Sequence, residues 1–322
     1  MENATQFIMA RVTGRRPTVH NNGMNAPSIK RYAWLSIATA IATILLKAAA
    51  WRITGSIGLL SDALESIVNL AGAMMALAMI SLAEQPADDR HAYGHGKAEY
   101  FSAGFEGLLI LIAAFAIAVT AVERILDPHP LEQVGIGLVV STIASLLNLV
   151  TALILRSAGK RYRSLTLEAD AHHLLTDVWT SIGVIAAVCA VSLTGMLWLD
   201  PAIALLVAGN IVWTGGKLLT RAVRGLMDNV LPDGEHAKVV AVLEAYRQEG
   251  IDYHALRTRE SGARRFVEVH ILVPGQWTVQ RGHEYVERLE ADIRLQLPQS
   301  TILTHLEPIE DPVSHEDIAL DR

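Results

Sequence analysis

Cysteine is almost absent from this chain, since Cys189 is the only one among 322 residues. A single thiol excludes a disulfide framework within the chain and a metal site made of several cysteines. Because Cys189 lies inside an apolar run, we expect it to be a small core residue.

Charged and aromatic residues are also sparse. They make up 19% and 6% of the sequence, and the net charge is −6. No basic stripe of the kind that binds nucleic acid is present, which excludes nucleic acid as a partner. Residues 1–25 lack a compact apolar segment before a small-residue cleavage site, so no cleavable signal peptide is predicted. We interpret residues 1–30 as a polar, cytoplasmic N-terminal tail.

Apolar residues, by contrast, are abundant, at 51% of the chain. This composition is too apolar for an ordinary soluble enzyme. A membrane-spanning helix needs roughly 20 mostly apolar residues. Six such stretches predict a multi-pass α-helical membrane protein with six transmembrane helices, at residues 33–51, 57–83, 100–126, 135–155, 171–196 and 201–223.

The connections between these stretches alternate in charge. The connections on one side of the membrane are short or poor in Lys and Arg, although Arg52 and Arg124 lie on that side. The basic residues of the other side are Lys30, Arg31, Arg90, Lys97, Arg156, Lys160, Arg161, Arg163, Arg221 and Arg224. Cytoplasmic loops carry the excess of Lys and Arg, so we expect both termini in the cytoplasm and the protein in a bacterial inner membrane.

After Val223 the composition changes to a charged segment without membrane-length apolar runs. It predicts a small cytoplasmic α+β domain of ferredoxin-like or metallochaperone-like type. Its expected helices are 235–249 and 278–297, and its expected strands are 253–260, 265–273 and 301–307, with a turn at Ser261-Gly262. We therefore divide the chain into a tail (1–30), a transmembrane domain (31–226), a cytoplasmic metal-binding dimerisation domain (227–310) and an acidic, disordered tail (311–322).

Two pairs of polar residues lie inside predicted spans. Glu65 and Asn69 in the second span, like His173 and Asp177 in the fifth, are four residues apart and share a helical face. Ionisable residues inside a membrane are costly and mark functional sites. Their mixed nitrogen and oxygen donors suit a tetrahedral Zn²⁺ and also Fe²⁺, Co²⁺ or Mn²⁺. The alternative is a polar seam that holds the helices together.

Three further polar residues compete for secondary roles. Asp62 precedes Glu65 by about one turn and is a candidate for the entrance or for supporting the ligands. His172 points about 100° away from His173, so the two do not bind one ion. Glu106 is either a proton path or a helix-packing contact, and we favour the packing contact.

In these features the sequence resembles the cation diffusion facilitator family over nearly all of residues 31–308. The segments that carry the resemblance are Gly55-Ser56, 60–66, 91–99, 168–177 and 304–308. It implies a homodimeric metal/proton antiporter whose transport site lies between the second and fifth spans. The implied ligands are Glu65, Asn69, His173 and Asp177. The family's zinc-type pattern has a His or Asp where Glu65 stands and an Asp where Asn69 stands, which leaves metal selectivity open.

The resemblance implies further sites outside the membrane. Asp88, His91 and His95 match a metal site in the loop between the second and third spans, and the alternative is a solvated loop. The cytoplasmic domain matches a binuclear metal site at His254, His270, His283, His305 and Glu307, and the alternative is scattered surface histidines. Lys97 and Asp228 match a charge pair that holds the dimer together near the membrane.

Together these features predict a secondary active transporter, not an enzyme, that exports a divalent transition metal in exchange for protons. Zn²⁺ is favoured, and Fe²⁺, Mn²⁺, Co²⁺, Ni²⁺ and Cd²⁺ remain open; no cofactor is expected. An intramembrane metalloenzyme is the weaker alternative because no His-Glu-x-x-His signature occurs. A non-transporting metal sensor is a third possibility, which the polar pairs within the spans disfavour.

Overall fold

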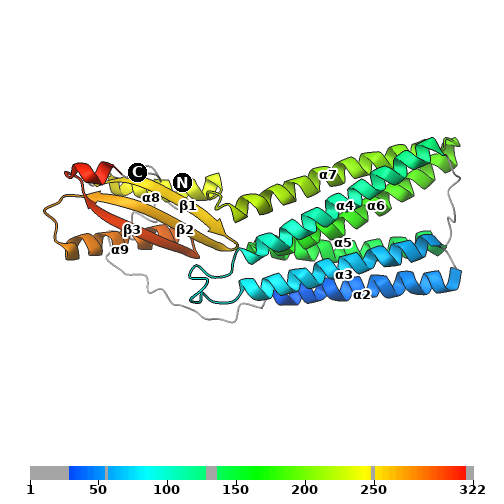
Figure 1. The fold of residues 1–322 in the computed structure, drawn as a ribbon, viewed down its shortest axis with the longest axis horizontal. Helices are drawn as coiled ribbons and strands as arrows, with labels where there is room; N and C mark the ends of the chain where they lie inside the picture. The colour runs from blue at the N-terminus through cyan, green and yellow to red at the C-terminus, as the bar shows by residue number, and fades with distance from the viewer. Residues whose placement is uncertain (1–28, 55–56, 128–135, 248–250, 317–322) are drawn as a thin grey trace, which may run out of the picture.

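The computed structural model describes residues 29–54, 57–127, 136–247 and 251–316 (Figure 1). The expected N-terminal tail therefore lies almost wholly outside the described residues, as does the side chain of Cys189. Each predicted span falls on one long helix. These helices are α2 (Lys30–Thr54), α3 (Ile57–Ala83), α4 (Ala98–Leu126), α5 (Ile136–Tyr162), α6 (Leu165–Thr194) and α7 (Leu199–Leu226).

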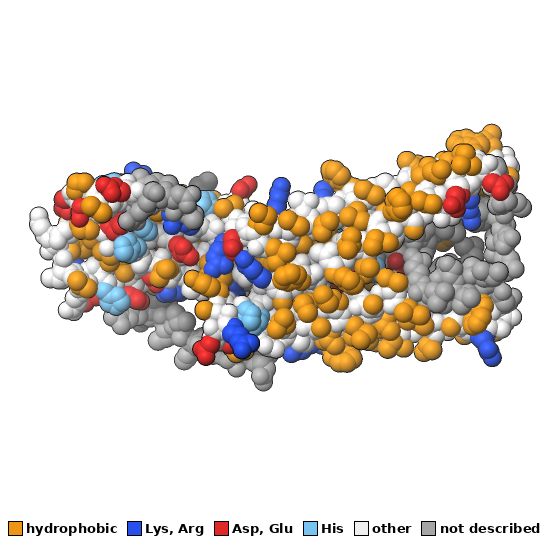
Figure 2. Space-filling model, viewed as in Figure 1, with side chains coloured by type: hydrophobic (Ala, Val, Ile, Leu, Met, Phe, Trp, Pro, Cys, Tyr) orange, Lys and Arg blue, Asp and Glu red, His pale blue; other side chains and the backbone are white. Residues whose placement is uncertain are grey.

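The long helices form an elongated bundle (Figure 1). In the described part of the chain, five of them, all but α6, are long and apolar enough to cross a membrane. Helix α6 packs against α4, α5 and α7 within the same bundle. Apolar side chains cover most of the visible helix surface, and most Lys and Arg side chains gather at the end next to the cytoplasmic domain (Figure 2). Arg124, which departs from this asymmetry, donates a hydrogen bond to Asp200.

The start of α6 differs from the prediction. We expected the fifth span to begin at residue 171, but the helix begins six residues earlier, at Leu165. The cause is an N-cap: the Ser164 hydroxyl accepts a hydrogen bond from the Leu167 N–H. The polar residues of this first turn resemble a loop in the sequence, but they extend the helix beyond the apolar run.

The cytoplasmic domain has one three-stranded sheet with two helices. Its elements are α8 (Asp233–Arg247), β1 (Asp252–Ser261), β2 (Arg264–Val273), α9 (Val279–Gln296), β3 (Ser300–Pro308) and η1 (Pro312–His315). The strand order is β1-β2-β3, with β1 antiparallel and β3 parallel to β2. Alternate residues of β2, such as Val267, Val269 and Ile271, join α8 and α9 in the apolar core. The other face of the sheet is therefore free to carry polar groups.

The first residues after Asp311 are ordered, unlike the disordered tail that we predict, whereas residues 317–322 lie outside the described part of the chain. Pro312–His315 forms a short 3₁₀ helix, and the side chain of Ser314 donates a hydrogen bond to the Pro308 carbonyl. Ser314 is buried, so this turn packs onto the end of β3.

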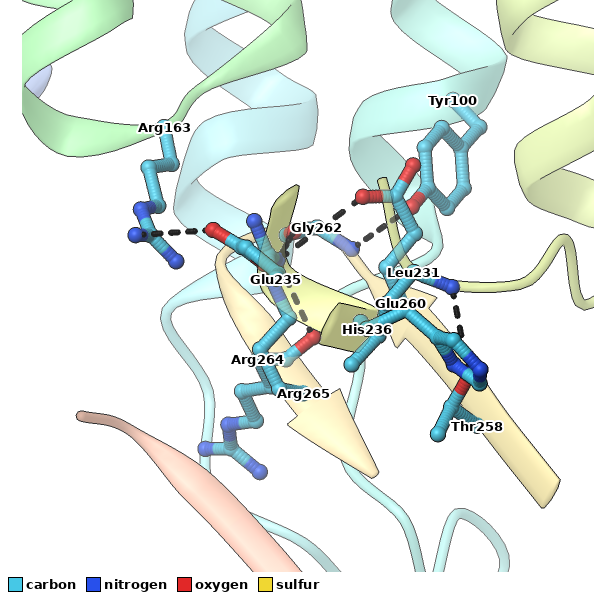
Figure 3. Close-up of polar contacts among 10 residues, drawn as sticks. All are labelled: Tyr100, Arg163, Leu231, Glu235, His236, Thr258, Glu260, Gly262, Arg264 and Arg265. Atoms are coloured by element: carbon cyan, nitrogen blue, oxygen red, sulfur yellow. Dashed lines mark hydrogen bonds and ion pairs between the residues drawn. The ribbon is translucent and has the colours of Figure 1, made fainter. Parts of the chain in front are cut away.

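Polar contacts join the cytoplasmic domain to the ends of the membrane helices (Figure 3). Arg163, between α5 and α6, lies 2.9 Å from Glu235 on α8. Glu235 in turn accepts a hydrogen bond of 2.6 Å from Arg265 on β2. The Gly262 N–H, in the β1–β2 turn, donates to the Tyr100 hydroxyl on α4 at 3.1 Å. These contacts connect the sheet directly to α4 and, through Glu235 of α8, to the α5–α6 link.

Glu235→Ala tests this junction. Arg265 is buried, and its charge would lose its nearest carboxylate. Breaking a buried ion pair from one side costs about 3–5 kcal/mol. We expect about 2–3 kcal/mol here, because Gly262 and Glu260 remain as acceptors for Arg265. Hydrogen exchange of the β2 amides measures the loss, with Glu287→Ala on the exposed face of α9 as the control. Unchanged β2 protection would contradict a structural role for Glu235.

Candidate metal sites

The first candidate site lies inside the helix bundle, between α3 and α6. The amide oxygen of Asn69 lies 2.7 Å from His173 Nε2. The amide nitrogen of Asn69 donates to the Asp177 carboxylate. Asn69 and His173 are both buried. The packing of α3 on α6 thus brings together three of the four predicted ligands. Glu65 lies on the same helix as Asn69, but its side chain, like that of Asp62, is outside the described residues.

Two residues from other helices join this cluster. Asn148 on α5 donates a hydrogen bond of 3.1 Å to the same Asp177 oxygen as Asn69. Glu106 on α4 is fully buried, and its carboxylate lies 3.6 Å from His173 Nδ1. Asn148 is not among the predicted ligands, although an amide in an apolar span is a usable signal. For Glu106 the favoured prediction is a helix-packing contact. The carboxylate does lie against Gly72, but it also faces His173.

The Glu106–His173 contact is suited to orienting the histidine. Within the described residues, the two carboxylate oxygens of Glu106 have no hydrogen-bond partner. The same is true of His173 Nδ1. A histidine that binds metal through one ring nitrogen commonly presents the other to a carboxylate, which fixes the ring. With Nε2 facing Asn69 and Nδ1 facing Glu106, the imidazole has that arrangement.

Glu106→Gln tests the orienting role. The amide keeps the size of the side chain but removes the carboxylate facing His173. Loss of such a supporting contact lowers metal affinity about 10–100-fold. We expect a rise of that size in the metal concentration for half-maximal transport in proteoliposomes. Glu123→Gln, near the exposed end of the same helix, is the control. Equal transport by both variants would show that Glu106 only fills space.

The second candidate site lies in the α3–α4 loop. His91 Nδ1 and His95 Nε2 lie 3.2 Å and 3.4 Å from the two oxygens of Asp88. The two histidine nitrogens are themselves 3.1 Å apart. Hydrogen bonds from the His91 and Arg90 N–H groups lower the pKa of Asp88, so it is an ionised acceptor at neutral pH. The loop therefore brings all three predicted side chains together, with donor atoms that could converge on one cation.

The third candidate site lies on the open face of the cytoplasmic sheet. His254, His270 and His305 are direct partners across β1, β2 and β3. Glu307 lies two residues after His305 on the same face. Its Oε2 is 2.8 Å from His254 Nε2 and 3.2 Å from His270 Nδ1, and its Oε1 is 3.5 Å from His305 Nε2. Glu307 thus links three histidines that are far apart in the sequence.

Two further histidines, His283 and His315, lie at different distances from this third site. His283 is exposed on α9. Among residues 251–316, no contact joins it to Glu307. His315, on the 3₁₀ turn, has its ring 6.2 Å from that of His254. His315 is not among the predicted ligands, because its segment is predicted to be a disordered tail.

The predicted charge pair forms within one chain. Lys97 Nζ, at the start of α4, lies 3.0 Å from Asp228, just after α7. Arg259 on β1 donates to the same Asp228 oxygen at 3.1 Å. Partial burial opposes ionisation of Asp228, but the hydrogen bonds from Lys97 and Arg259 outweigh it and lower the pKa. The pair therefore joins the membrane helices to the sheet at the position where the cytoplasmic domain begins.

A helical membrane domain with a buried Asn–His–Asp cluster, joined to an α+β domain with histidine clusters, defines a metal-cation transporter. Residues 33–227 match the model of the cation efflux transmembrane domain, and residues 231–309 match that of the cation efflux protein cytoplasmic domain. The chain therefore belongs to the cation efflux family, the cation diffusion facilitators, and is a multi-pass transporter for efflux of divalent metal cations.

Relatives match along most of their length. The chain is 50% identical over 291 residues to an uncharacterized transporter of Synechocystis sp., with 90% of this chain and 94% of that protein covered. It is 32% identical over 275 residues to the cation-efflux pump FieF of Pectobacterium carotovorum subsp. carotovorum, covering 84% and 91%. With FieF of Klebsiella pneumoniae the identity is 30% over 281 residues, covering 87% and 93%.

Proposed function

We propose that this transporter exports a divalent transition metal, with Zn²⁺ favoured, in exchange for protons. The observation that carries the proposal is the Asn69–His173–Asp177 cluster buried between α3 and α6. With Glu65 as a fourth ligand, the set has one nitrogen and three oxygen donors, which suits Zn²⁺ and also Fe²⁺, Mn²⁺ or Co²⁺. Ni²⁺ and Cd²⁺ remain further candidates for the same site.

Proton exchange follows from the chemistry of these ligands. Imidazole and carboxylate bind metal only when deprotonated, so protons and metal compete for one site. Facing the cytoplasm, the site loses its protons and takes up metal. Facing the more acidic outer side, His173 and a carboxylate regain protons and release the ion. Glu106 acts in this scheme by holding the His173 ring in place.

We also propose a homodimer in a bacterial inner membrane, with both termini in the cytoplasm. The distribution of Lys and Arg along the bundle supports this orientation (Figure 2). Residues 31–226 then form the transmembrane domain and 227–310 the dimerisation domain. The open face of the sheet, with His254, His270 and Glu307, is the regulatory metal site. The loop of Asp88, His91 and His95 is a further metal site, and the Lys97–Asp228 pair connects the cytoplasmic domain to the helices.

A proteoliposome assay with a metal panel tests the function. The proteoliposomes are loaded with a metal-sensitive dye, and Zn²⁺, Fe²⁺, Mn²⁺, Co²⁺, Ni²⁺ and Cd²⁺ are added outside with and without an imposed pH gradient. We expect the fastest uptake with Zn²⁺, and acceleration when the interior is acidic. Transport indifferent to the gradient would contradict proton exchange. The absence of flux for every metal would favour a membrane metal sensor.

A further inference from the structure

A cavity with both polar and apolar walls opens between α5, α6 and α7, away from the transport site. Its volume is about 200 Å³. Arg156 of α5, His172 and Thr176 of α6, and Asn210 and Thr214 of α7 supply its polar lining. Arg156 and Asn210 are exposed, so the cavity is open at the side of the bundle. His172 therefore belongs to a different surface of α6 from His173, which faces Asn69.

Arg156 brings a permanent positive charge to the cavity, and no acidic residue lines it. Among the residues that the structure describes, no hydrogen bond or ion pair is formed by the side chain of Arg156 or of His172. Lys160, Arg221 and Glu168 also lie within electrostatic range of His172. Glu168 is already paired with Arg221, so it does not compensate Arg156.

The depth of Arg156 places its charge close to the lipid headgroups. Arg156 lies six residues before the end of α5, about 9 Å along the axis at 1.5 Å per residue. An arginine at this distance from a helix end directs its charge to the membrane interface. The anions available to it there are the phosphates of the lipid headgroups.

The remaining walls indicate what the partner of Arg156 is. Leu175 and Ile211 line the cavity beside the polar groups, and Trp179 lies half-exposed at its edge. Trp179 lies seven residues beyond His172 on α6, about 10 Å further along the helix, so its half-exposed ring faces acyl chains and not headgroups. A ligand with a phosphate and an apolar tail contacts both the polar and the apolar walls, whereas a free anion contacts only the polar ones.

We propose that this cavity binds the headgroup of an anionic phospholipid from the leaflet at the cytoplasmic end of the helices. The planar guanidinium of Arg156 donates to the phosphate, and Asn210 and Thr214 supply further polar contacts to the headgroup. The acyl chains lie along Leu175 and Trp179. Basic pockets between membrane helices bind anionic lipids on physical grounds that do not depend on the transported metal.

Fluorescence quenching of Trp179 by brominated lipids tests the proposal. The full-length protein is reconstituted in mixtures of phosphatidylcholine and phosphatidylglycerol, with the bromine on one lipid at a time. The Trp179 signal is the difference from Trp179→Phe. We expect about fivefold preference for phosphatidylglycerol at Trp179, a factor that one basic residue near the surface supplies. Arg156→Gln should reduce this preference to near unity.

The controls separate the proposal from general surface charge. Arg161→Gln removes the same charge five residues further along α5, outside the cavity, and should keep the preference. Arg156→Lys keeps the charge and should lose only part of the preference for phosphatidylglycerol. This variant covers the case in which Arg156→Gln fails to fold. Equal quenching by both lipids, or an equal effect of Arg161→Gln, would overturn the site. Abolition of the preference by millimolar inorganic phosphate would show a soluble-anion site and overturn the lipid assignment.

Discussion

Replacement of Asp177 by asparagine should abolish metal export, with a loss of more than about 100-fold. A residue that only supports a ligand already contributes 10–100-fold to metal affinity, and Asp177 is a proposed ligand. Its carboxylate accepts hydrogen bonds from both Asn69 and Asn148, so its position is held from two helices. Asparagine preserves the shape but removes the negative charge that compensates a divalent ion.

The measurement is initial metal flux in proteoliposomes at equal protein content. Asp200→Asn is the matched control, because Asp200 lies in the first turn of α7 and pairs with Arg124 outside the transport cluster. We expect it to retain nearly full flux. If Asp177→Asn transports as fast as Asp200→Asn, the cluster between α3 and α6 is a polar seam and the transport site lies elsewhere.

Replacement of Glu307 by glutamine should have the second-largest effect, on metal binding by the cytoplasmic domain. Glu307 is the residue that connects His254, His270 and His305, with contacts of 2.8 Å, 3.2 Å and 3.5 Å. Glutamine at this position lacks the charge that attracts the cation and presents one amide nitrogen to the histidines. We expect a loss of about 100-fold in the affinity of this site, the upper value for a change beside a metal.

The affinity change is separable from transport. Metal content of the full-length protein is measured by equilibrium dialysis over a range of free Zn²⁺, and flux is measured in parallel. Glu284→Gln, on the exposed face of α9, controls for the change in net charge. Unaltered metal content in Glu307→Gln would contradict the third site, whereas lost content with normal flux would show that the site is not required for transport.

Much of the architecture follows from local pattern. The lengths of the apolar runs predict the membrane helices, because only a helix of that length satisfies its backbone within a bilayer. Alternation along β3 predicts that His305 and Glu307 share a face, and their side chains are in contact. Spacing of four residues likewise places His173 and Asp177 on one face of α6, and both contact Asn69.

Other features depend on how distant segments meet. Glu106 and Asn148 reach the α3–α6 cluster from α4 and α5, and His315 approaches His254 from a turn expected to be disordered. His283 matches the family pattern but lies on an exposed helix face. The cavity at Arg156 involves three helices and has no sequence signature.

One physical cause separates the features that are predictable from the sequence from those that are not. The sequence by itself determined the membrane class, the cytoplasmic domain and the polar pairs within single elements, because run length and periodicity are properties of one segment. Only the tertiary structure decided which elements face one another, since that depends on side-chain packing across the whole bundle and sheet. The neighbours of His173, the partners of Glu307 and the unpaired charge of Arg156 all belong to this second kind.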